Sequence, residues 1–105
     1  MSTTPFLERI GLSEEEQKVY LSLLALGPLT AGEISKYTGV KPISKVKQIL
    51  ETFFSKNYAY NVEGLVDKAI GLYPFREIAE EAGKDGEKID AIVAELKQYV
   101  ANQVK

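Results

Sequence analysis

Cysteine and histidine are both absent from the 105-residue chain. Without cysteine the chain can form neither a disulfide nor a thiolate metal site, and without histidine it lacks the commonest general base and metal ligand. No apolar run approaches the ~20 residues that a membrane-spanning helix needs, and the amino-terminal residues do not have the pattern of a signal peptide. We therefore expect a cytoplasmic protein that is not inserted in a membrane and carries no cofactor.

Catalytic and metal-binding patterns are missing as well. The sequence has no nucleophile–base constellation, no phosphate loop and no nucleotide-binding fingerprint. Acidic residues do cluster at Glu80–Glu81 and around Asp85, Glu87 and Asp90. Carboxylates on a helix surface rarely converge as a hard cation requires, so we interpret these clusters as solvated surface. The sequence predicts neither a metal site nor an enzyme.

The charge of the chain is unevenly distributed, although its net value is only −2. Residues 1–33 and 63–105 each carry −3, whereas residues 34–62 carry +4, because five lysines there oppose Glu51 alone. Charges within ~8–10 Å of a bound phosphate count most at physiological salt. A basic surface on an acidic domain can therefore still bind nucleic acid. The size and the ordinary composition (45% hydrophobic, 27% charged) predict one globular domain with a single modest core.

The start of the first long helix is marked by a capping box. Ser13 is followed three residues later by Glu16, and acidic residues fill the first turn, where the helix dipole favours negative charge. The helix is expected to run to Leu26, because Gly27–Pro28 stops it. Its apolar stripe comprises Val19, Tyr20, Leu23, Leu24 and Leu26.

Two further helices follow, separated by a glycine turn. Thr30 and Glu33 repeat the capping box for a short helix that ends near Thr38, with Ile34 and Tyr37 expected to face inward. Gly39 suits the left-handed position that reverses the chain, and Pro42 fits the first turn of the next helix, predicted over residues 43–55. The inward residues of that helix are expected to be Val46, Ile49, Leu50 and Phe53. Two helices joined in this way form a helix-turn-helix, which presents its second helix to a DNA groove.

After Asn57, a plausible helix stop, the periodicity changes from helix to strand. Residues 58–62 and 69–73 are predicted to form two short strands, and Glu63–Gly64 between them is a turn signal. Together they predict a β-hairpin. Pro74 opens a helix over residues 75–82, and a glycine-containing hinge precedes a last helix over residues 87–104. Six aromatic residues of this half are expected to fill the core: Phe53, Phe54, Tyr58, Tyr60, Tyr73 and Phe75.

The predicted fold class is mainly α with a small β-hairpin, a winged helix-turn-helix with a C-terminal amphipathic helix. We expect the winged domain to span residues 1–82, and the hinge and last helix to span 83–105. A lone amphipathic helix either folds back on its own domain or pairs with a second copy, and the hinge also allows it to dock on another protein. We favour a homodimer, because two copies are needed to cover a palindromic site. The expected dimer seam consists of Ile89, Ile92, Val93, Leu96, Tyr99 and Val100, extended by Gln103 or Val104.

The order of these anchors resembles one known family. They are Gly11-Leu12-Ser13, Glu16, Val19-Tyr20-Leu21, Leu26-Gly27-Pro28, Thr30-Ala31, Glu33-Ile34, Thr38-Gly39-Val40, Lys45-Val46 and Ile49-Leu50. This pattern is similar to the N-terminal winged-helix domain of TrmB-like transcriptional regulators, which are best known from archaea. The resemblance implies a dimeric DNA-binding regulator with the helix at 43–55 in the major groove and the hairpin near the adjacent backbone. We do not expect sugar sensing, because the chain leaves no room for the sugar-binding domain of the larger members.

The residues expected to contact double-stranded DNA lie around the start of the helix at 43–55. Lysine binds phosphate as a point charge, and glutamine can pair with adenine. The expected set is Lys36, Lys41, Ile43, Ser44, Lys45, Lys47 and Gln48.

Three departures from the family pattern favour an alternative, a winged-helix module that binds another protein and does not touch DNA. There is one extra residue between Val40 and Val46. Ile43 stands where a polar residue is common, and the hairpin carries a net charge of −1 from Glu63, Asp67 and Lys68.

Overall fold

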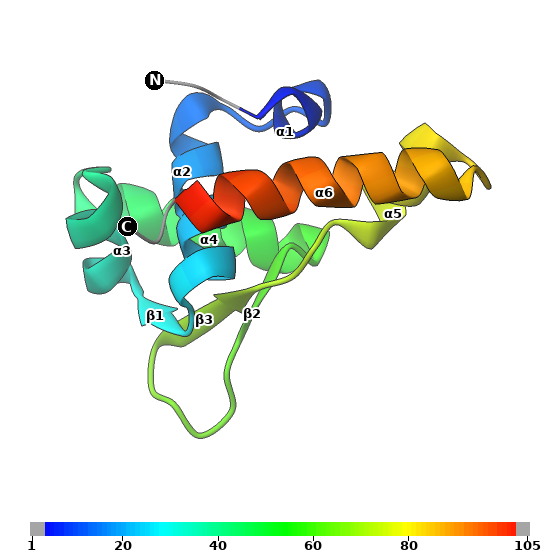
Figure 1. Cartoon of the computed structure of the whole chain (residues 1–105). Coiled ribbons are helices and arrows are strands. Elements are labelled where there is room, and N and C mark those ends of the chain that lie inside the picture. The colour runs from blue at the N-terminus through cyan, green and yellow to red at the C-terminus, as the bar shows by residue number, and fades with distance from the viewer. Residues whose placement is uncertain (1–3, 103–105) are drawn as a thin grey trace.

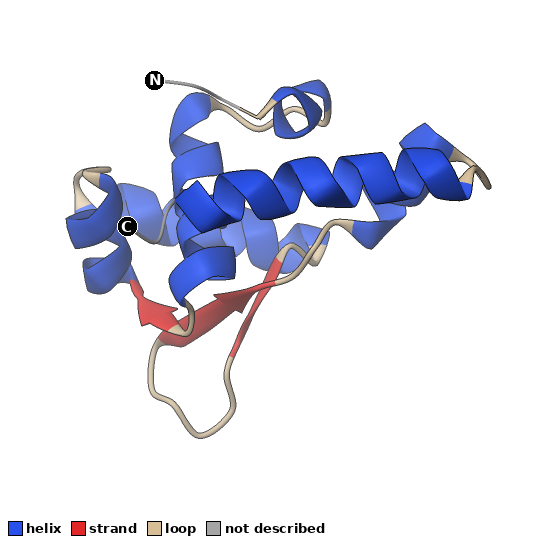
Figure 2. Cartoon of the chain, in the orientation of Figure 1, coloured by secondary structure: helices blue, strands red, loops and turns tan. Residues whose placement is uncertain are grey.

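The structure is a computed structural model that describes residues 4–102. Helices dominate this part of the chain, and three short strands form one small sheet (Figures 1 and 2). In chain order the elements are α1 (Pro5–Arg9), α2 (Glu14–Leu26), β1 (Leu29–Thr30), α3 (Ala31–Thr38), α4 (Ile43–Lys56), β2 (Ala59–Asn61), β3 (Lys68–Gly71), α5 (Phe75–Ala82) and α6 (Gly86–Asn102). The predicted mainly α winged helix-turn-helix with a C-terminal helix is confirmed.

Helix α2 is the centre of the domain. It packs against α3, α4, α6 and β3, and Figure 1 shows α6 crossing in front of it. Val19, Tyr20 and Leu23 of the predicted stripe are fully buried, and Leu24 and Leu26 are partly buried against the same core. Because α2 contacts elements from both halves of the chain, its apolar stripe holds the helix-turn-helix, the sheet and α6 together.

Both predicted capping boxes are present. The Ser13 backbone N–H donates to Glu16 Oε1 at 2.8 Å, and the Glu16 N–H donates to Ser13 Oγ at 3.2 Å. Thr30 and Glu33 make the equivalent bonds at 2.9 and 3.1 Å. The turn after α3 has Gly39 in the left-handed region (φ 77°), as predicted, because a side chain there would be strained.

The sheet has one strand more than the sequence predicted. The strand order is β1-β3-β2 with antiparallel pairing, so β3 lies between the two others. In β1, Leu29 pairs with Ala69 and Thr30 with Lys68. The two-residue β1 is too short to leave a periodicity in the sequence, and only its pairing with a distant segment defines it as a strand.

The aromatic core is smaller than predicted. Tyr20, Phe53 and Tyr58 form a buried triangle, with ring centroids 5.6 Å apart for Tyr20–Phe53 and 6.1 Å for Phe53–Tyr58. The expectation was wrong for Tyr60, which alternates with the buried Ala59 and so points to the outer face of the sheet, and for Phe75, which is exposed at the start of α5. Phe54 and Tyr73 are partly buried.

Tyr37 is also exposed, at 61%, so its predicted inward orientation is wrong. The buried side of α3 carries Ala31, Ile34 and Ser35, at the i, i+3 and i+4 spacing of one helix face. Tyr37 lies off that face. A second, smaller difference concerns Pro42, which is the residue before α4 (the N-cap) and not part of its first turn.

Helix α6 folds back on its own chain. It packs on α2 and α5, and the Phe6 backbone N–H in α1 donates to Glu95 Oε2 at 3.1 Å. The expected helix end at Val104, with Gln103 or Val104 in the seam, lies outside the described residues. Within residues 4–102, no helix is long and apolar enough to cross a membrane.

Candidate nucleic-acid interface

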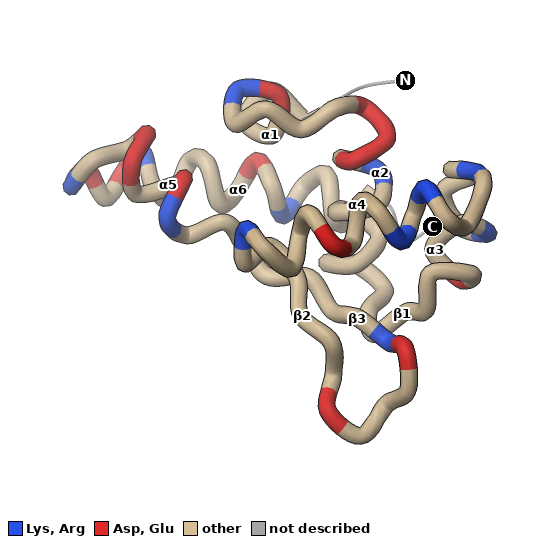
Figure 3. The backbone as a smooth tube through the Cα atoms, turned by 180° about the vertical axis from the view of Figure 1, so that it is seen from behind, with Lys and Arg blue, Asp and Glu red and all other residues tan. Residues whose placement is uncertain are grey.

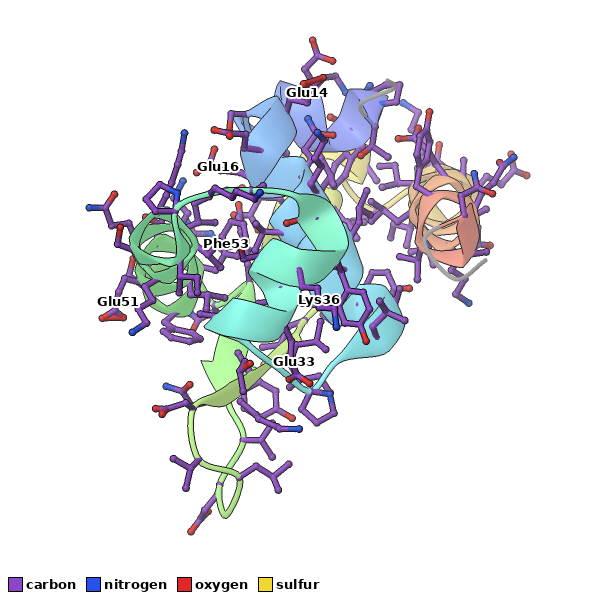
Figure 4. All side chains as sticks on the ribbon, turned by 90° about the vertical axis from the view of Figure 1, so that its left-hand side faces the viewer. Glu14, Glu16, Glu33, Lys36, Glu51 and Phe53 are labelled. Carbon is purple, nitrogen blue, oxygen red and sulfur yellow. The ribbon has the colours of Figure 1, made fainter. Side chains whose placement is uncertain are left out.

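Helix α4 has one buried side and one solvent side. Val46, Ile49, Leu50 and Phe53 are buried, as predicted, and they fix the helix against α2 and the sheet. Figure 4 shows Phe53 directed between α4 and α2, whereas Glu51 points away from the body of the domain. The buried stripe therefore determines which α4 side chains remain accessible to a ligand.

All seven residues of the expected DNA-contact set are exposed. Lys36 lies on α3, Lys41 in the turn, and the other five in the first two turns of α4. Among residues 4–102 no side chain caps the start of α4, and its first turn contains no acidic residue. The positive end of the helix dipole therefore faces solvent beside the lysines, an arrangement that favours an anion.

The set divides between two sides of α4. Lys45 and Gln48 border a shallow groove of about 340 Å³ toward α2, together with Ser13, Glu15, Glu16, Ile49 and Thr52. Ile43 and Lys47 border another groove on the opposite side of the helix. The sequence predicted the exposed positions, but it did not predict this division.

On the α2 side, the Lys45 ammonium forms an ion pair with Glu15 Oε1. Both side chains remain partly exposed. Sequence reasoning missed this contact, because Glu15 and Lys45 lie on different helices and only the packing of α4 on α2 brings them together. No described residue forms an ion pair with Lys36, Lys41 or Lys47.

On the other side, a groove of about 570 Å³ separates α4 from the loop at residues 62–67, which we call the wing loop. The groove has an apolar floor formed by Ile43, Leu50 and Phe54, and Val66 borders it from the wing loop. Charges of both signs surround it: Lys47 and Glu51 on α4 and Asp67 on the wing loop. Ile43 is 46% exposed, so part of this apolar surface is open to solvent.

The wing loop is acidic and has an apolar tip. It carries Glu63 and Asp67 without a basic residue, and its tip exposes Leu65 (44%) and Val66 (85%). Figure 3 shows acidic segments on this loop and basic segments around the start of α4. Phosphate contact by the wing loop is therefore opposed by charge.

Lys68, which follows the wing loop at the base of the hairpin, contacts α3. The Lys68 ammonium lies 3.9 Å from Glu33 Oε1, and the same carboxylate accepts the Thr30 N–H. The hydrogen bond from the Thr30 backbone, supported by the charge of Lys68, lowers the pKa of Glu33 below its ordinary value. The basic residue nearest to the loop therefore already has an acidic partner within the domain.

A larger hollow, about 740 Å³, lies on another part of the surface, between the end of α4 and α5. The Tyr58 hydroxyl donates to Glu77 Oε2 at 3.0 Å there, and burial together with this bond raises the pKa of Tyr58 to about 12. Lys56 and Arg76 share the hollow with glutamates, so its charge is mixed. Within residues 4–102 no group of three or more acidic side chains is arranged to hold a metal ion.

The six residues of the expected dimer seam all lie on the side of α6 that packs on the same chain. Ile92 and Leu96 belong to the buried core, and Ile89, Val93, Tyr99 and Val100 are partly buried against it. In the described part of the chain, α6 has no exposed large hydrophobic side chain. The fold-back arrangement considered for this helix is therefore the one observed, and pairing with a second copy stays a prediction.

The sequence matches a known protein family. The family described as sugar-specific transcriptional regulator TrmB matches residues 7–70, more than half of the chain. The matched segment contains the helix-turn-helix and most of the sheet. No curated protein and no solved structure matches the chain.

Proposed function

This chain belongs to the TrmB family of transcriptional regulators, and from that premise we propose that it regulates transcription by binding double-stranded DNA through α4. One observation carries the proposal. The first two turns of α4 and the turn before them present lysines, a serine and a glutamine to solvent, beside an uncapped helix start.

The side chains divide by chemistry. Lys41 and Lys47 are suited to DNA phosphates, with Lys36 on α3 as an additional contact, because a flexible ammonium binds phosphate without base selectivity. Ser44 and Gln48 are suited to base edges in the major groove, where glutamine can make a bidentate contact with adenine. Ile43 is suited to an apolar contact with a thymine methyl group.

The test is DNA binding as a function of salt. We expect the protein to shift a random duplex at ~50 mM salt, with log affinity falling linearly with log salt at about −0.9 per phosphate contacted. Changing both Lys41 and Lys47 to Glu should weaken binding by about 10- to 100-fold and make the slope less steep by about 1.8.

A matched control separates local contact from net charge. Lys84→Glu with Lys97→Glu changes the net charge equally, on exposed lysines of the α5–α6 part of the chain. This control should bind almost as well as the wild type. Equal losses in both double variants would contradict a docking site on α4. Absence of any shift by the wild type at ~50 mM salt would contradict the DNA function itself.

We further propose that the protein works as a homodimer, because palindromic sites require two copies about one helical turn apart. Ile92 and Leu96 are already buried within the chain, so a dimer through α6 would use the partly buried Ile89, Val93, Tyr99 and Val100. Sedimentation equilibrium should give a mass that rises with concentration towards twice the monomer. A monomer at all concentrations up to those used for DNA binding would refute the dimer.

The second candidate function is a protein-binding module, and the groove between α4 and the wing loop favours it. Its apolar floor and the exposed Ile43 offer an anchor site for a partner side chain, and the wing loop that borders it is acidic. Ile43→Lys distinguishes the two functions. It should strengthen binding to random DNA if α4 meets phosphate, and leave DNA binding absent if the surface serves a protein.

A further inference from the structure

We propose that Glu15 occupies the place of a DNA phosphate at Lys45, so that it lowers sequence-independent affinity and makes binding depend more on base contacts. Glu15 thereby sets how strongly the α4 surface binds DNA of any sequence. The inference rests on the proposed DNA-binding function.

The geometry places the carboxylate where a phosphate would be bound. Lys45 lies in the first turn of α4, and its ammonium contacts Glu15 Oε1 on α2. Gln48, the candidate for base contact, borders the same groove. A duplex that inserts α4 into its groove must therefore approach Glu15, and Lys45 can bind a phosphate only after it leaves the carboxylate.

Glu15 is not needed for the start of α2. The capping box is complete with Ser13 and Glu16, each bonded to the backbone N–H of the other. Glu14 and Glu16 remain to interact with the helix dipole in the same turn. Because the helix is capped without it, the carboxylate at position 15 can be removed as a test without removing the cap.

The expected size follows from how exposed ion pairs behave. A lysine that meets phosphate gains affinity by releasing counterions from the DNA. Lys45 must first give up a partner, whereas no described residue pairs with Lys36, Lys41 or Lys47. An exposed ion pair is weak, so the competition should change affinity by about two- to five-fold and not by orders of magnitude.

This reduction applies to DNA of any sequence. Phosphate contacts contribute to the affinity for a correct site and for random DNA alike, so Glu15 lowers both affinities. Because the base contacts of Gln48 and Ser44 are retained, they supply a larger share of the remaining binding free energy. Removing Glu15 should therefore increase binding to DNA of any sequence.

The experiment compares variants of the 105-residue chain on one random duplex by fluorescence anisotropy over a series of salt concentrations. Glu15→Gln should bind about two- to five-fold more tightly than the wild type, with a salt slope steeper by about 0.9. Glu14→Gln is the matched control, because it makes the same charge change one residue earlier, on an exposed side chain outside the groove. Thermal unfolding of both variants should confirm that the fold is retained.

The double variant Glu15→Gln/Lys45→Gln identifies the partner. The gain from Glu15→Gln should disappear when Lys45 is also neutralised. Equal gains in Glu14→Gln and Glu15→Gln, or a gain that persists without Lys45, would overturn the inference and leave DNA binding intact. If neither the wild type nor Glu15→Gln binds the duplex at ~50 mM salt, the proposed function fails and the inference fails with it.

Discussion

Helix α4 and the wing loop border the same groove, yet they present opposite chemistry. The start of α4 offers lysines and an uncapped helix end, whereas the wing loop offers Glu63, Asp67 and an apolar tip. If α4 binds DNA as proposed, the wing loop across the groove would lie beside the duplex. The difference indicates that DNA held by α4 would be attracted on one side only, and that the wing loop would not serve as a phosphate clamp.

The two regions nevertheless depend on the same core. Phe53 belongs to α4, Tyr58 leads into β2, and their rings meet at Tyr20 of α2. The Tyr20 hydroxyl also donates to the Leu72 carbonyl just after β3, which ties the sheet to α2. Their opposite surfaces are therefore held in position by one set of buried aromatic contacts.

The largest expected effect, on the free energy of unfolding, comes from removing one of these buried aromatic rings. Phe53→Ala should lower the free energy of unfolding by about 3–5 kcal/mol, because it removes a fully buried ring and leaves a cavity. Denaturant unfolding followed by circular dichroism measures the change. Phe75→Ala is the matched control, because Phe75 is exposed. Surface substitutions usually change the free energy of unfolding by only about 0.5 kcal/mol, so this variant should lose less than about 1 kcal/mol. Similar losses in the two variants would contradict the assignment of Phe53 as the shared support.

A smaller effect is expected when the difference in charge between α4 and the wing loop is removed by substitutions in the loop. Glu63→Lys combined with Asp67→Asn should tighten binding to random duplex by about ten-fold and make the salt slope steeper by about 0.9, because one new lysine meets phosphate. Asparagine is chosen at position 67 because this residue has a positive φ of 58°, which asparagine tolerates. If the affinity for the duplex does not change, the wing loop does not approach the DNA. The difference in charge between α4 and the wing loop would then have no effect on DNA binding.

The smallest expected effect is on acid stability at the base of the wing. The pKa of Glu33 is lowered in the folded chain, first by the Thr30 N–H and then by Lys68. A carboxylate with a lowered folded pKa stabilises the protein above its unfolded pKa, and that contribution is lost as the pH falls through the folded value. Glu33→Gln keeps an acceptor for the capping box but no charge, so thermal unfolding should depend less on pH below its ordinary pKa of 4.5.

The control for acid stability is Glu14→Gln, which removes a carboxylate that forms no ion pair with any described residue. It should leave the pH dependence of the unfolding temperature close to that of the wild type. An equal flattening in both variants would mean that general charge, and not the contact at the base of the wing, controls acid stability.

The parts of the fold that were predicted from sequence are those set by local interactions. A capping box needs only residues three positions apart, so Ser13 with Glu16 and Thr30 with Glu33 were recognisable without the structure. The buried stripe of α4 was predicted because a helix of this length repeats its apolar positions several times. The exposure of the lysines near its start followed from the same stripe.

The features that were missed depend on contacts between distant segments. Strand β1 exists only through its pairing with β3, and the Lys45–Glu15 ion pair exists only because α4 packs on α2. The apolar side of α6 predicted that this side of the helix is buried. It did not specify whether the helix packs on its own domain or on a second copy. Tyr37 was misplaced because the eight-residue α3 is too short to define its inner face clearly.

Thr30 connects the stem of the hairpin to the helix-turn-helix. It pairs with Lys68 at the stem of the hairpin and is also the N-cap of α3. The stem is therefore fixed to the helix-turn-helix, whereas the wing loop beyond it is exposed and contains Gly64 at a positive φ of 86°. Such a loop accepts insertions and charge changes at little cost in stability. The reach and charge of the wing can thus evolve, or be engineered, independently of the surface that α4 presents.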